Sequence, residues 1–415
     1  MSNTPQIRFA GFTDAWEQRK LSDMVERVTR KNENLESELP LTISAQYGLI
    51  DQNEFFDKRI ASRDVSGYYL LKKGEFAYNK STSSDAPWGA VKRLDRYEMG
   101  VLSTLYIVFA LKEDGNIDSD FLVSYYDTDC WHKGVQAIAA EGARNHGLLN
   151  ITPADYFETV LTVPSNVKEQ HQIGTFFAKL DSLITLHQRK CDALQKFKKS
   201  MLQKMFPQNG ESVPEIRFAG FTDAWEQRKL NTLVEFYSGL TYKPEDVTEN
   251  GTLVLRSSNV KNAEVVLTDN VYVDESVVNS ENVKKDDIIV VVRNGSKALI
   301  GKHAKIRHSM PNTVIGAFMT GIRSDSPDFI NALLSTDTFD KEIKMNMGAT
   351  INQITGYMFA NMEFMTPSFQ ERQAVGSFFS HLDDLITLHQ REPPKEDKIL
   401  NDIKTDTLFH EYYCQ

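Results

Sequence analysis

One fifteen-residue segment occurs twice in this chain without a single change. The sequence IRFAGFTDAWEQRKL stands at residues 7–21 and again at residues 216–230, at a spacing of 209. A second segment, ending in LITLHQR, also occurs twice, at residues 164–189 and 367–391. A spacing of 209 is far longer than the roughly 20–50 residues of a solenoid repeat. The chain is therefore a duplicated frame, with one insert in each copy.

The two inserts, residues 22–163 and 231–366, have diverged. They show little similarity apart from a Gly-Ala pair near the end of each, at Gly142-Ala143 and Gly348-Ala349. A tandem duplication of one enzyme domain is the simplest alternative, but it would leave inserts that still match. An almost unchanged frame around two different inserts favours a scaffold that presents two different binding domains.

The second repeated segment opens a long helix. Residues 168–206 contain one glycine and no proline, and their apolar positions advance in alternating steps of four and three. This period of about 3.5 residues is typical of a coiled coil. The residues predicted to pair are Ile173, Phe177, Leu180, Ile184 and His187 in the first copy, and Val375, Phe379, Leu382, Ile386 and His389 in the second. We expect the two helices to pair antiparallel. The alternative is that each helix packs on its own domain.

Both inserts are rich in β-branched and aromatic residues. Residues 68–110 and 251–323 alternate short apolar runs with turn signals, and each insert ends in a helical segment and a strand. We predict an α+β protein, in which two mixed α/β domains are separated by long helices that pair as an antiparallel coiled coil with a pseudo-two-fold internal repeat. The predicted divisions are domains at 1–163 and 208–366, long helices at 164–207 and 367–391, and a divergent acidic tail at 392–415.

Polar side chains gather on the predicted turns of both inserts. Arg, Lys, Asn, Gln, Ser and Thr are the residues that hold phosphates and contact base edges, although they also populate ordinary surface loops. We expect the following residues to bind DNA: Asn79, Lys80, Ser81, Thr82, Arg144, Asn145 and His146 in the first insert, and Arg256, Ser257, Ser258, Asn259, Arg293, Asn294, Ser296, Lys297, Asn352 and Gln353 in the second.

Charge and cysteine content narrow the class of protein. The net charge is −10, yet residues 179–204 carry seven basic and two acidic side chains. Such a helix is either a solvated face or a contact for phosphate or an acidic protein. Three cysteines without a paired spacing favour a reducing compartment. The sequence has neither a membrane-length apolar run nor a signal peptide, so a cytoplasmic location is expected.

Catalytic and metal-binding motifs are weak. The segment from Gly295 to His303 differs from a phosphate-binding loop because five residues separate its glycines and His replaces the Ser or Thr that holds magnesium. His303 and His308 lie on a basic loop without a neighbouring Cys or carboxylate cluster. We therefore expect no catalytic residues and no metal site in this chain.

The frame resembles the specificity subunits of type I restriction–modification systems, especially firmicute, staphylococcal-like members. The resemblance rests on PSNVKEQ at residues 164–170, on FFAKLDSLITLHQR and FFSHLDDLITLHQR, and on the repeated FAGFTDAWEQRKL, and it spans residues 6–391. It implies two target-recognition domains, each reading one half of a split, asymmetric DNA site. The implied partners are double-stranded DNA, two methyltransferase subunits and motor–nuclease subunits. S-adenosylmethionine, ATP and magnesium would be used by these partners, and no cofactor would be bound by this chain.

The second copy departs from the first after Arg391. Pro393-Pro394 is expected to stop the helix there, and the tail carries more acidic than basic residues. A shortened or frame-shifted end of this kind would give a weakened or inactive variant. Three further possibilities stay open: a stand-alone DNA-binding protein, a protein-interaction scaffold and a self-contained nuclease.

Overall fold

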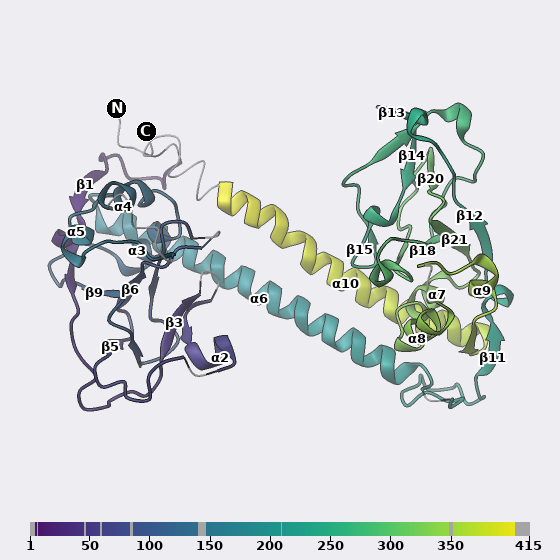
Figure 1. The fold of residues 1–415 in the computed structure, drawn as a ribbon, viewed down its shortest axis with the longest axis horizontal. Coiled ribbons are helices and arrows are strands. Elements are labelled where there is room, and N and C mark those ends of the chain that lie inside the picture. The colour runs from purple at the N-terminus through teal and green to yellow at the C-terminus, as the bar shows by residue number, and fades with distance from the viewer. Residues whose placement is uncertain are drawn as a thin grey trace. The chain divides into compact units, whose positions relative to one another are not determined.

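The computed structural model describes residues 5, 7–44, 47–58, 60–83, 86–139, 147–208, 210–347 and 352–402, with side chains as far as His389. The chain divides into two compact units, Met1–His187 with Glu392–Gln415, and Gln188–Arg391. Two long helices, α6 (Val167–Met205) and α10 (Phe369–Asp402), each cross this division (Figure 1). The division therefore falls inside the helices, and the inserts on either side are each folded as mixed α/β structures.

The first insert forms small antiparallel sheets followed by three helices. Its central sheet has the strand order β2-β9-β6-β7, and β1 pairs with β10 at the two ends of the insert. The elements are β1 (Glu17–Lys20), α1 (Leu21–Met24), β2 (Val25–Arg27), β3 (Leu41–Ser44), β4 (Gly48–Asp51), α2 (Gln52–Phe56), β5 (Tyr69–Lys72), β6 (Phe76–Asn79), β7 (Ala90–Arg93), β8 (Met99–Leu102), β9 (Ile107–Leu111), α3 (Ser119–Tyr126), α4 (His132–Ile138), α5 (Pro153–Phe157) and β10 (Val160–Val163).

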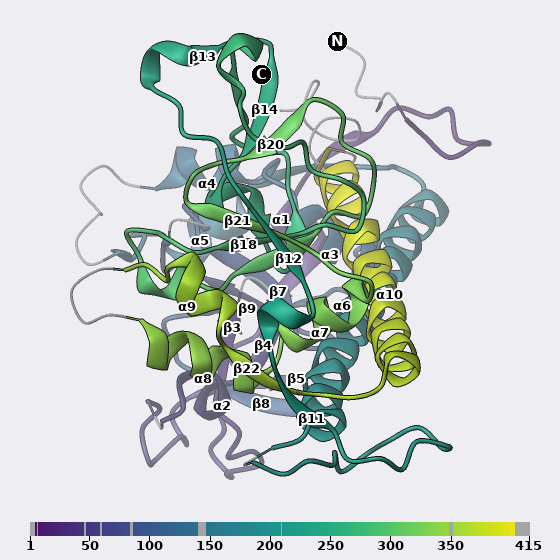
Figure 2. The ribbon, with the colours of Figure 1, turned by 90° about the vertical axis from the view of Figure 1, so that its right-hand side faces the viewer.

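The second insert has a central sheet of order β12-β21-β18-β19 and a second sheet of order β13-β17-β14-β20. Its elements are β11 (Glu226–Lys229), η2 (Leu230–Thr232), β12 (Glu235–Ser238), η3 (Pro244–Asp246), β13 (Val247–Thr248), β14 (Thr252–Leu255), η4 (Ser257–Asn259), β15 (Val260–Lys261), β16 (Glu264–Val265), β17 (Val271–Val273), η5 (Glu275–Val277), β18 (Ile288–Val291), η6 (Lys297–Leu299), β19 (His303–Lys305), β20 (Thr313–Ile315), β21 (Met319–Arg323), α7 (Pro327–Leu333), α8 (Asp337–Asn346), α9 (Gly356–Ala360) and β22 (Glu363–Thr366). Figure 2 shows the central sheet with α7, α8 and α9 beside it.

The central sheets of the two inserts share one strand order although the sequences of the inserts have diverged. Strands β2, β9, β6 and β7 correspond in order to β12, β21, β18 and β19. The closing pairs also match, because β1 runs antiparallel to β10 and β11 runs antiparallel to β22 in the same register. The prediction of two mixed α/β domains joined by long helices is confirmed, and each insert ends in three helices rather than one. Strand order survives sequence divergence because it depends on the alternation of apolar positions and not on their identity.

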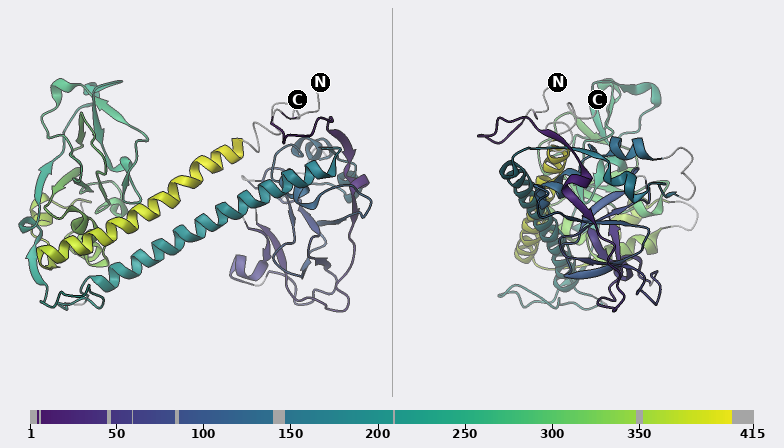
Figure 3. Two further views of the ribbon diagram at one scale, coloured as in Figure 1. Left: turned by 180° about the vertical axis from the view of Figure 1, so that it is seen from behind. Right: turned by 90° about the vertical axis from the view of Figure 1, so that its left-hand side faces the viewer.

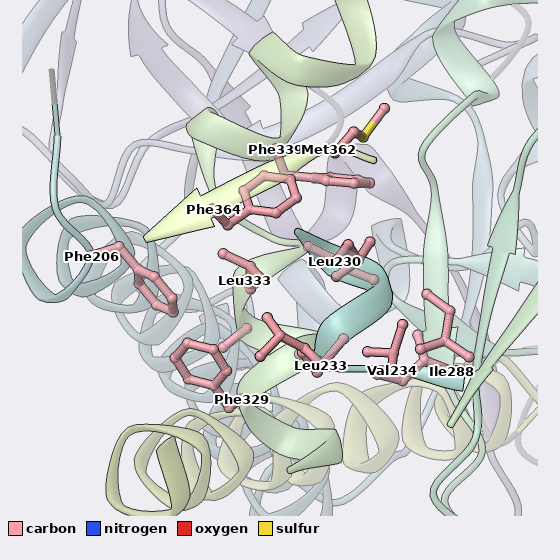
Figure 4. Packing of buried hydrophobic residues seen from close by; sticks show 14 of the residues in the cluster. Phe206, Leu230, Leu233, Val234, Ile288, Phe329, Leu333, Phe339, Met362 and Phe364 are labelled. Carbon is pink, nitrogen blue, oxygen red and sulfur yellow. The ribbon is translucent and has the colours of Figure 1, made fainter. Parts of the chain in front are cut away.

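Alternation explains why the central strands read as continuous apolar runs. In β18, Ile288 and Val290 pack against the helices of the second unit, whereas Ile289 and Val291 pack against the second sheet. Successive side chains of a strand point to opposite faces, so a strand covered on both faces is apolar throughout. Figure 4 shows the helix-side core, where Ile288 lies with Leu230, Phe329 and Leu333.

Each long helix begins as part of the core of one compact unit. Ile173 and Phe177 belong to the core of the first unit, and Val375, Phe379 and Leu382 belong to that of the second. These residues of the predicted stripe therefore contribute to the core of their own unit, and their role in helix pairing stays a prediction. The helices start directly after β10 and β22, so their first turns must cover the nearest apolar surface, which is that of their own unit.

A glycine in each long helix permits this close packing. An added Cβ at Gly174 would lie 2.4 Å from the backbone nitrogen of Phe121, and one at Gly376 would lie 2.6 Å from that of Phe329. Helix α6 therefore meets the start of α3 as α10 meets the start of α7. Any side chain at either glycine would force the two helices apart.

The C-terminal half of α6 contacts α10 within the second unit. Leu202, Met205 and Phe206 share one apolar cluster with Phe379, and the ring centroids of Phe206 and Phe379 lie 6.0 Å apart. Lys198 forms an ion pair with Asp383, and since 198 precedes 206 while 383 follows 379, the helices run antiparallel here (Figure 3). Leu180, Ile184 and His187 lie half-buried on the first unit's part of α6, and Ile386 and His389 are buried on α10. The predicted stripe is therefore the less exposed face of each helix.

Helix α10 does not end at the proline pair. It continues through Pro393-Pro394 to Asp402, which corrects the expected stop at Arg391. Proline removes one helical hydrogen bond, but its fixed φ near −65° is itself helical, so the chain can continue. With 34 residues against 39, α10 is about 51 Å long and α6 about 58 Å. The length expected for the second helix was therefore too short.

Within the part of the chain that the structure describes, no helix combines the length and apolar character needed to cross a membrane.

Candidate nucleic-acid interface

The candidate residues of the two inserts occupy corresponding places. Tyr78 lies opposite Ile107 in the first central sheet, as Val290 lies opposite Thr320 in the second. By this register, residues 79–82 correspond to residues 291–294. An isolated bridge confirms the match beyond the strands, because Ser81 pairs with Leu148 and Arg293 pairs with Gln353. Both groups of polar residues therefore leave the same end of the same strand.

In the first unit this strand end is held by the loop at residues 147–151. Lys80 donates from Nζ to the carbonyl oxygen of Ile151 at 3.2 Å, and the backbone N–H of Thr82 donates to the Gly147 oxygen at 2.7 Å. Asn79 accepts a hydrogen bond from the N–H of Ser81, which is itself exposed. Burial lowers the pKa of the Lys80 amine below its ordinary value. The structure thus gives Lys80 a structural contact, and leaves Ser81 open to solvent.

Arg144, Asn145 and His146 are outside the described residues, so their role stays a prediction.

In the second unit the structure brings three separate loops together. The Asn294 amide donates to Ser257 Oγ at 2.9 Å, and the Asn352 amide donates to the carbonyl of Gly295 at 2.9 Å. Residues 256–259, 293–297 and 352–353 are therefore neighbours although about 100 positions separate the first from the last. Arg293, Ser296 and Lys297 are exposed on this surface. These neighbouring loops therefore present cationic and amide side chains that a ligand could contact together.

An exposed aromatic side chain lies among these polar groups. The guanidinium carbon of Arg293 lies 5.0 Å from the ring centroid of Phe318, at cation–π distance. The carbonyl of Phe318 accepts from the backbone N–H groups of Val292 and Arg293, at 3.0 and 3.2 Å. Arg293 is thereby positioned by its neighbours without a carboxylate in the described structure, and its charge stays available.

Only some of the polar residues in the loop at residues 256–259 face the polar surface. Asn259 is fully buried, and its amide donates to the carbonyls of Val266 and Thr268 at 3.0 and 3.2 Å. This corrects the prediction that Asn259 binds DNA, since its polar atoms are used to close the loop. Arg256 forms an ion pair with Asp269 at 2.9 Å and is about one-third exposed.

Ser258 is also turned inward. Its hydroxyl oxygen is buried without a hydrogen-bond partner among the described residues. Of this loop, Arg256 and Ser257 are the two residues that retain access to the polar surface.

Two residues at this surface were missed by the sequence reasoning. Leu105 and Phe318 are large apolar side chains, 59% and 50% exposed. Both stand in apolar runs, VLSTLYIVFAL and VIGAFMTGI, where pattern alone predicts burial. Their position in a turn between two strands distinguishes them from the buried residues of the same runs. That position can be recognised only when the strand boundaries are known.

Among the described residues, no group of three or more His, Cys, Asp or Glu side chains is placed to hold a metal ion.

Comparison with known proteins finds similarity in both sequence and fold. Residues 222–396 match the family described as "Type I restriction modification DNA specificity domain". The chain is 24% identical over 253 residues to the type I restriction enzyme MjaVIII specificity subunit of Methanocaldococcus jannaschii, which covers 58% of this chain and 60% of that protein. It is 26% identical over 173 residues to the StySPI specificity subunit of Salmonella potsdam, covering 40% of this chain and 36% of that protein.

The chain thus spans less than two thirds of the length of these relatives. Over 98% of its own length it has the fold of the crystal structure of the type I restriction–modification S subunit from M. genitalium, which it covers to 99%, with a TM-score of 0.66 at 15% identity. These relatives do not test the predicted firmicute origin. In sequence, residues 222–396 are similar to the DNA specificity domain of type I restriction–modification proteins, and in fold the chain is similar to the S subunit from M. genitalium.

Proposed function

We propose that this chain is the DNA sequence-recognition subunit of a type I restriction–modification complex and reads a split, asymmetric site with its two inserts. One observation carries the proposal. The same strand end, in two inserts of one topology, bears different polar side chains, Ser81 and Thr82 in the first and Arg293 and Asn294 in the second. Two domains that recognise different half-sites need different side chains at equivalent positions.

Catalysis would belong to partner subunits. We infer that two methyltransferase subunits dock on the repeated frame, and that motor–nuclease subunits bind the resulting assembly, with S-adenosylmethionine, ATP and magnesium used by those partners. The frame supports this inference with one edge-on pair of phenylalanines in each copy. Phe9 packs edge-on against Phe176 at 5.9 Å in the first copy, and Phe218 against Phe378 at 6.0 Å in the second. Ile7 and Ile216 are exposed beside them. A repeated arrangement of this kind suits two copies of one partner.

Adenine methylation in a host genome tests this function directly. The chain would be expressed with a cognate methyltransferase subunit in a host without other type I systems, and methylated adenines would be mapped. The expected result is one new asymmetric motif in two parts. Replacing residues 22–163 with the insert of another specificity subunit should change one half of the motif and leave the other half and the gap unaltered. A change in both halves would contradict separate readers.

The length of α10 is tested in the same assay. Replacing residues 392–402 with residues 190–200 continues the second helix with the sequence of the first. Because α10 already runs to Asp402, we expect the motif and its gap to stay the same. A motif gained only with the replacement would show that the natural segment weakens assembly.

A further inference from the structure

Leu105 and Phe318 occupy the same turn in the two units. In the first unit the turn joins β8 to β9, and the N–H of Tyr106 donates to the carbonyl of Ser103 at 3.1 Å. In the second unit it joins β20 to β21, and the N–H of Met319 donates to the carbonyl of Gly316 at 2.9 Å. The residue before the closing N–H is Leu105 in one case and Phe318 in the other.

The turn lies beside the polar strand end in both units. Phe318 is bonded through its carbonyl to Val292 and Arg293. In the first unit the pairing of Tyr78 with Ile107, continued by two residues, sets Leu105 opposite Lys80. Each exposed apolar side chain therefore adjoins the candidate DNA-binding residues of its own unit.

A single exposed apolar residue is common on a protein surface and needs no explanation. Here the exposure recurs at one turn in two inserts whose sequences have otherwise diverged. The neighbours of this turn within the strands, Val101 and Leu102 in the first unit and Val314 and Ile315 in the second, are buried. Exposure of a large apolar side chain in this turn, next to buried strands, is therefore a shared feature of the two units.

We propose that Leu105 and Phe318 each contact the C5 methyl group of a thymine in the major groove, one in each half of the DNA site. This inference rests on the proposed function and adds a chemical target to it. The thymine methyl is the one apolar group that a base pair presents in the major groove, and phenylalanine and other apolar side chains contact it. The side chains around it, Arg293 and Asn294 in the second unit, can bond the polar edges of neighbouring bases.

Insertion of the ring between base pairs is the other use of such a residue. The geometry of the second unit disfavours it. The Arg293 guanidinium lies over one face of the Phe318 ring, at 5.0 Å from the centroid, whereas an inserted ring needs both faces for the bases. The Phe318 side chain is 50% exposed, and the edge of a ring is sufficient to contact a methyl group.

Removal of the methyl group from the DNA tests the inference. Random-sequence duplexes would be selected with the full-length chain in complex with its methyltransferase subunit. The selected duplex would then be remade with deoxyuridine in place of thymidine, one position at a time. We expect one position in each half-site at which uracil weakens binding about fourfold, the effect of losing one buried methyl contact. Phe318→Ala should abolish that sensitivity in one half-site only, and Leu105→Ala in the other only.

Phe369→Ala provides a matched control in the second unit. Phe369 is 46% exposed, and the guanidinium carbon of Arg372 lies 5.5 Å from its ring centroid, so it has the same residue type and a similar environment. This variant should retain both uracil-sensitive positions. Absence of uracil sensitivity in the unmodified protein, or its persistence in Phe318→Ala, would overturn the thymine contact. Failure to select any sequence would instead contradict the proposed function.

Discussion

Lys198 on α6 and Asp383 on α10 form an ion pair in which the Nζ and Oδ1 atoms lie 2.5 Å apart, with 14% and 15% of the two side chains exposed. Lys198 interrupts the apolar stripe of α6, a position at which an unpaired charge would be unfavourable. Its partner, Asp383, corresponds to Asp181 in the first copy of the helix. The pair therefore fixes the antiparallel register of the two helices in the second unit.

Replacing Lys198 by methionine should lower the free energy of unfolding of the second unit by about 1–3 kcal/mol. Methionine keeps the stem but leaves the Asp383 carboxylate half-buried without its counter-ion. The measurement is urea unfolding followed by circular dichroism. Lys199→Met, at an exposed neighbouring position, should change stability by no more than about 0.5 kcal/mol. The reversed pair, Lys198→Asp with Asp383→Lys, should recover part of the loss, and an equal loss in both lysine variants would argue against the pair.

Two buried glutamates hold the two copies of the repeated segment. Glu169 is bonded by Arg8 Nε and Nη2 at 2.5 and 2.7 Å, and Glu371 by the corresponding atoms of Arg217, both at 2.7 Å. The hydrogen bond to Glu371 raises the pKa of the Arg217 guanidinium. Trp16 also donates to Glu169, at 3.4 Å.

Each glutamate should therefore stabilise its own unit. Glu169→Gln and Glu371→Gln remove the charge and keep the shape, so each leaves an arginine without its counter-ion and should cost about 3 kcal/mol. Hydrogen exchange would report the loss in the unit that carries the substitution and not in the other. Glu226→Gln, at an exposed ion pair with Arg228, is the control and should have almost no effect. Equal exchange changes in both units would contradict separate anchoring.

The helical glycines predict a second, steric form of destabilisation. Gly174→Ala and Gly376→Ala place a methyl group against backbone, so each should cost about 1–3 kcal/mol although alanine favours helix. The matched control is Gly134→Ala in α4, where the nearest atom to an added Cβ is 3.7 Å away. That variant should gain up to about 1 kcal/mol from helix propensity. Thermal unfolding of the three variants would separate the two effects, and a gain at Gly174 or Gly376 would exclude close packing there.

The stability of the second unit should depend on pH through His303. Burial chiefly lowers the pKa of this histidine to about 4, from about 6.5 in an unfolded chain. Between these values the unfolded state binds the proton and the folded state does not. The contribution is therefore fully present above about pH 6.5 and is lost as the pH falls toward 4, by about 3 kcal/mol in total.

Unfolding measured across this range should show a steeper fall in stability for the natural chain than for His303→Gln. The two proteins would also differ in absolute stability, because His303 Nε2 lies 3.1 Å from Ser335 Oγ. The slope of the free energy of unfolding against pH reports only the protonation of His303. Parallel curves between pH 4 and 6.5 would rule out the lowered pKa.

Arg293 is predicted to act on the second half of the DNA site. Arg293→Ala should weaken binding of the selected duplex about tenfold or more, and relax the preference for bases in that half only. Arg228→Ala, which removes an exposed arginine from the frame strand β11, should leave the base preference unchanged. A uniform loss across all sequences would mean that Arg293 contacts phosphate and not a base.

Much of the architecture was predictable because it depends on local pattern. The repeated segments, the 3.5-residue stripe of α6 and the β-rich inserts are visible in the order of the residues alone. The stripe even marks the buried face through His187 and Lys198, since helical geometry places every such position on one side. The end of α10 differs from the prediction because the fixed φ of proline is itself helical, and the helix continues through Pro393-Pro394.

The candidate interface was predictable only in part. Residue type indicated Arg293, Asn294 and Asn352, and the fold brings them together, but residue type also indicated Asn259, which tertiary contacts bury. Polar side chains serve loops and ligands alike, so composition cannot separate the two uses.

The sequence by itself determined that the chain is a duplicated frame with two long helices and two unlike inserts. Only the tertiary structure decided that those inserts share one strand order, that Ser81 and Arg293 stand at the same place, and that Leu105 and Phe318 reach solvent from the same turn. Repeats and periodicity can be read from the order of the residues along the chain. The equivalence of two positions and the exposure of a side chain arise from contacts between residues distant in the chain, which divergent sequences can form in the same way.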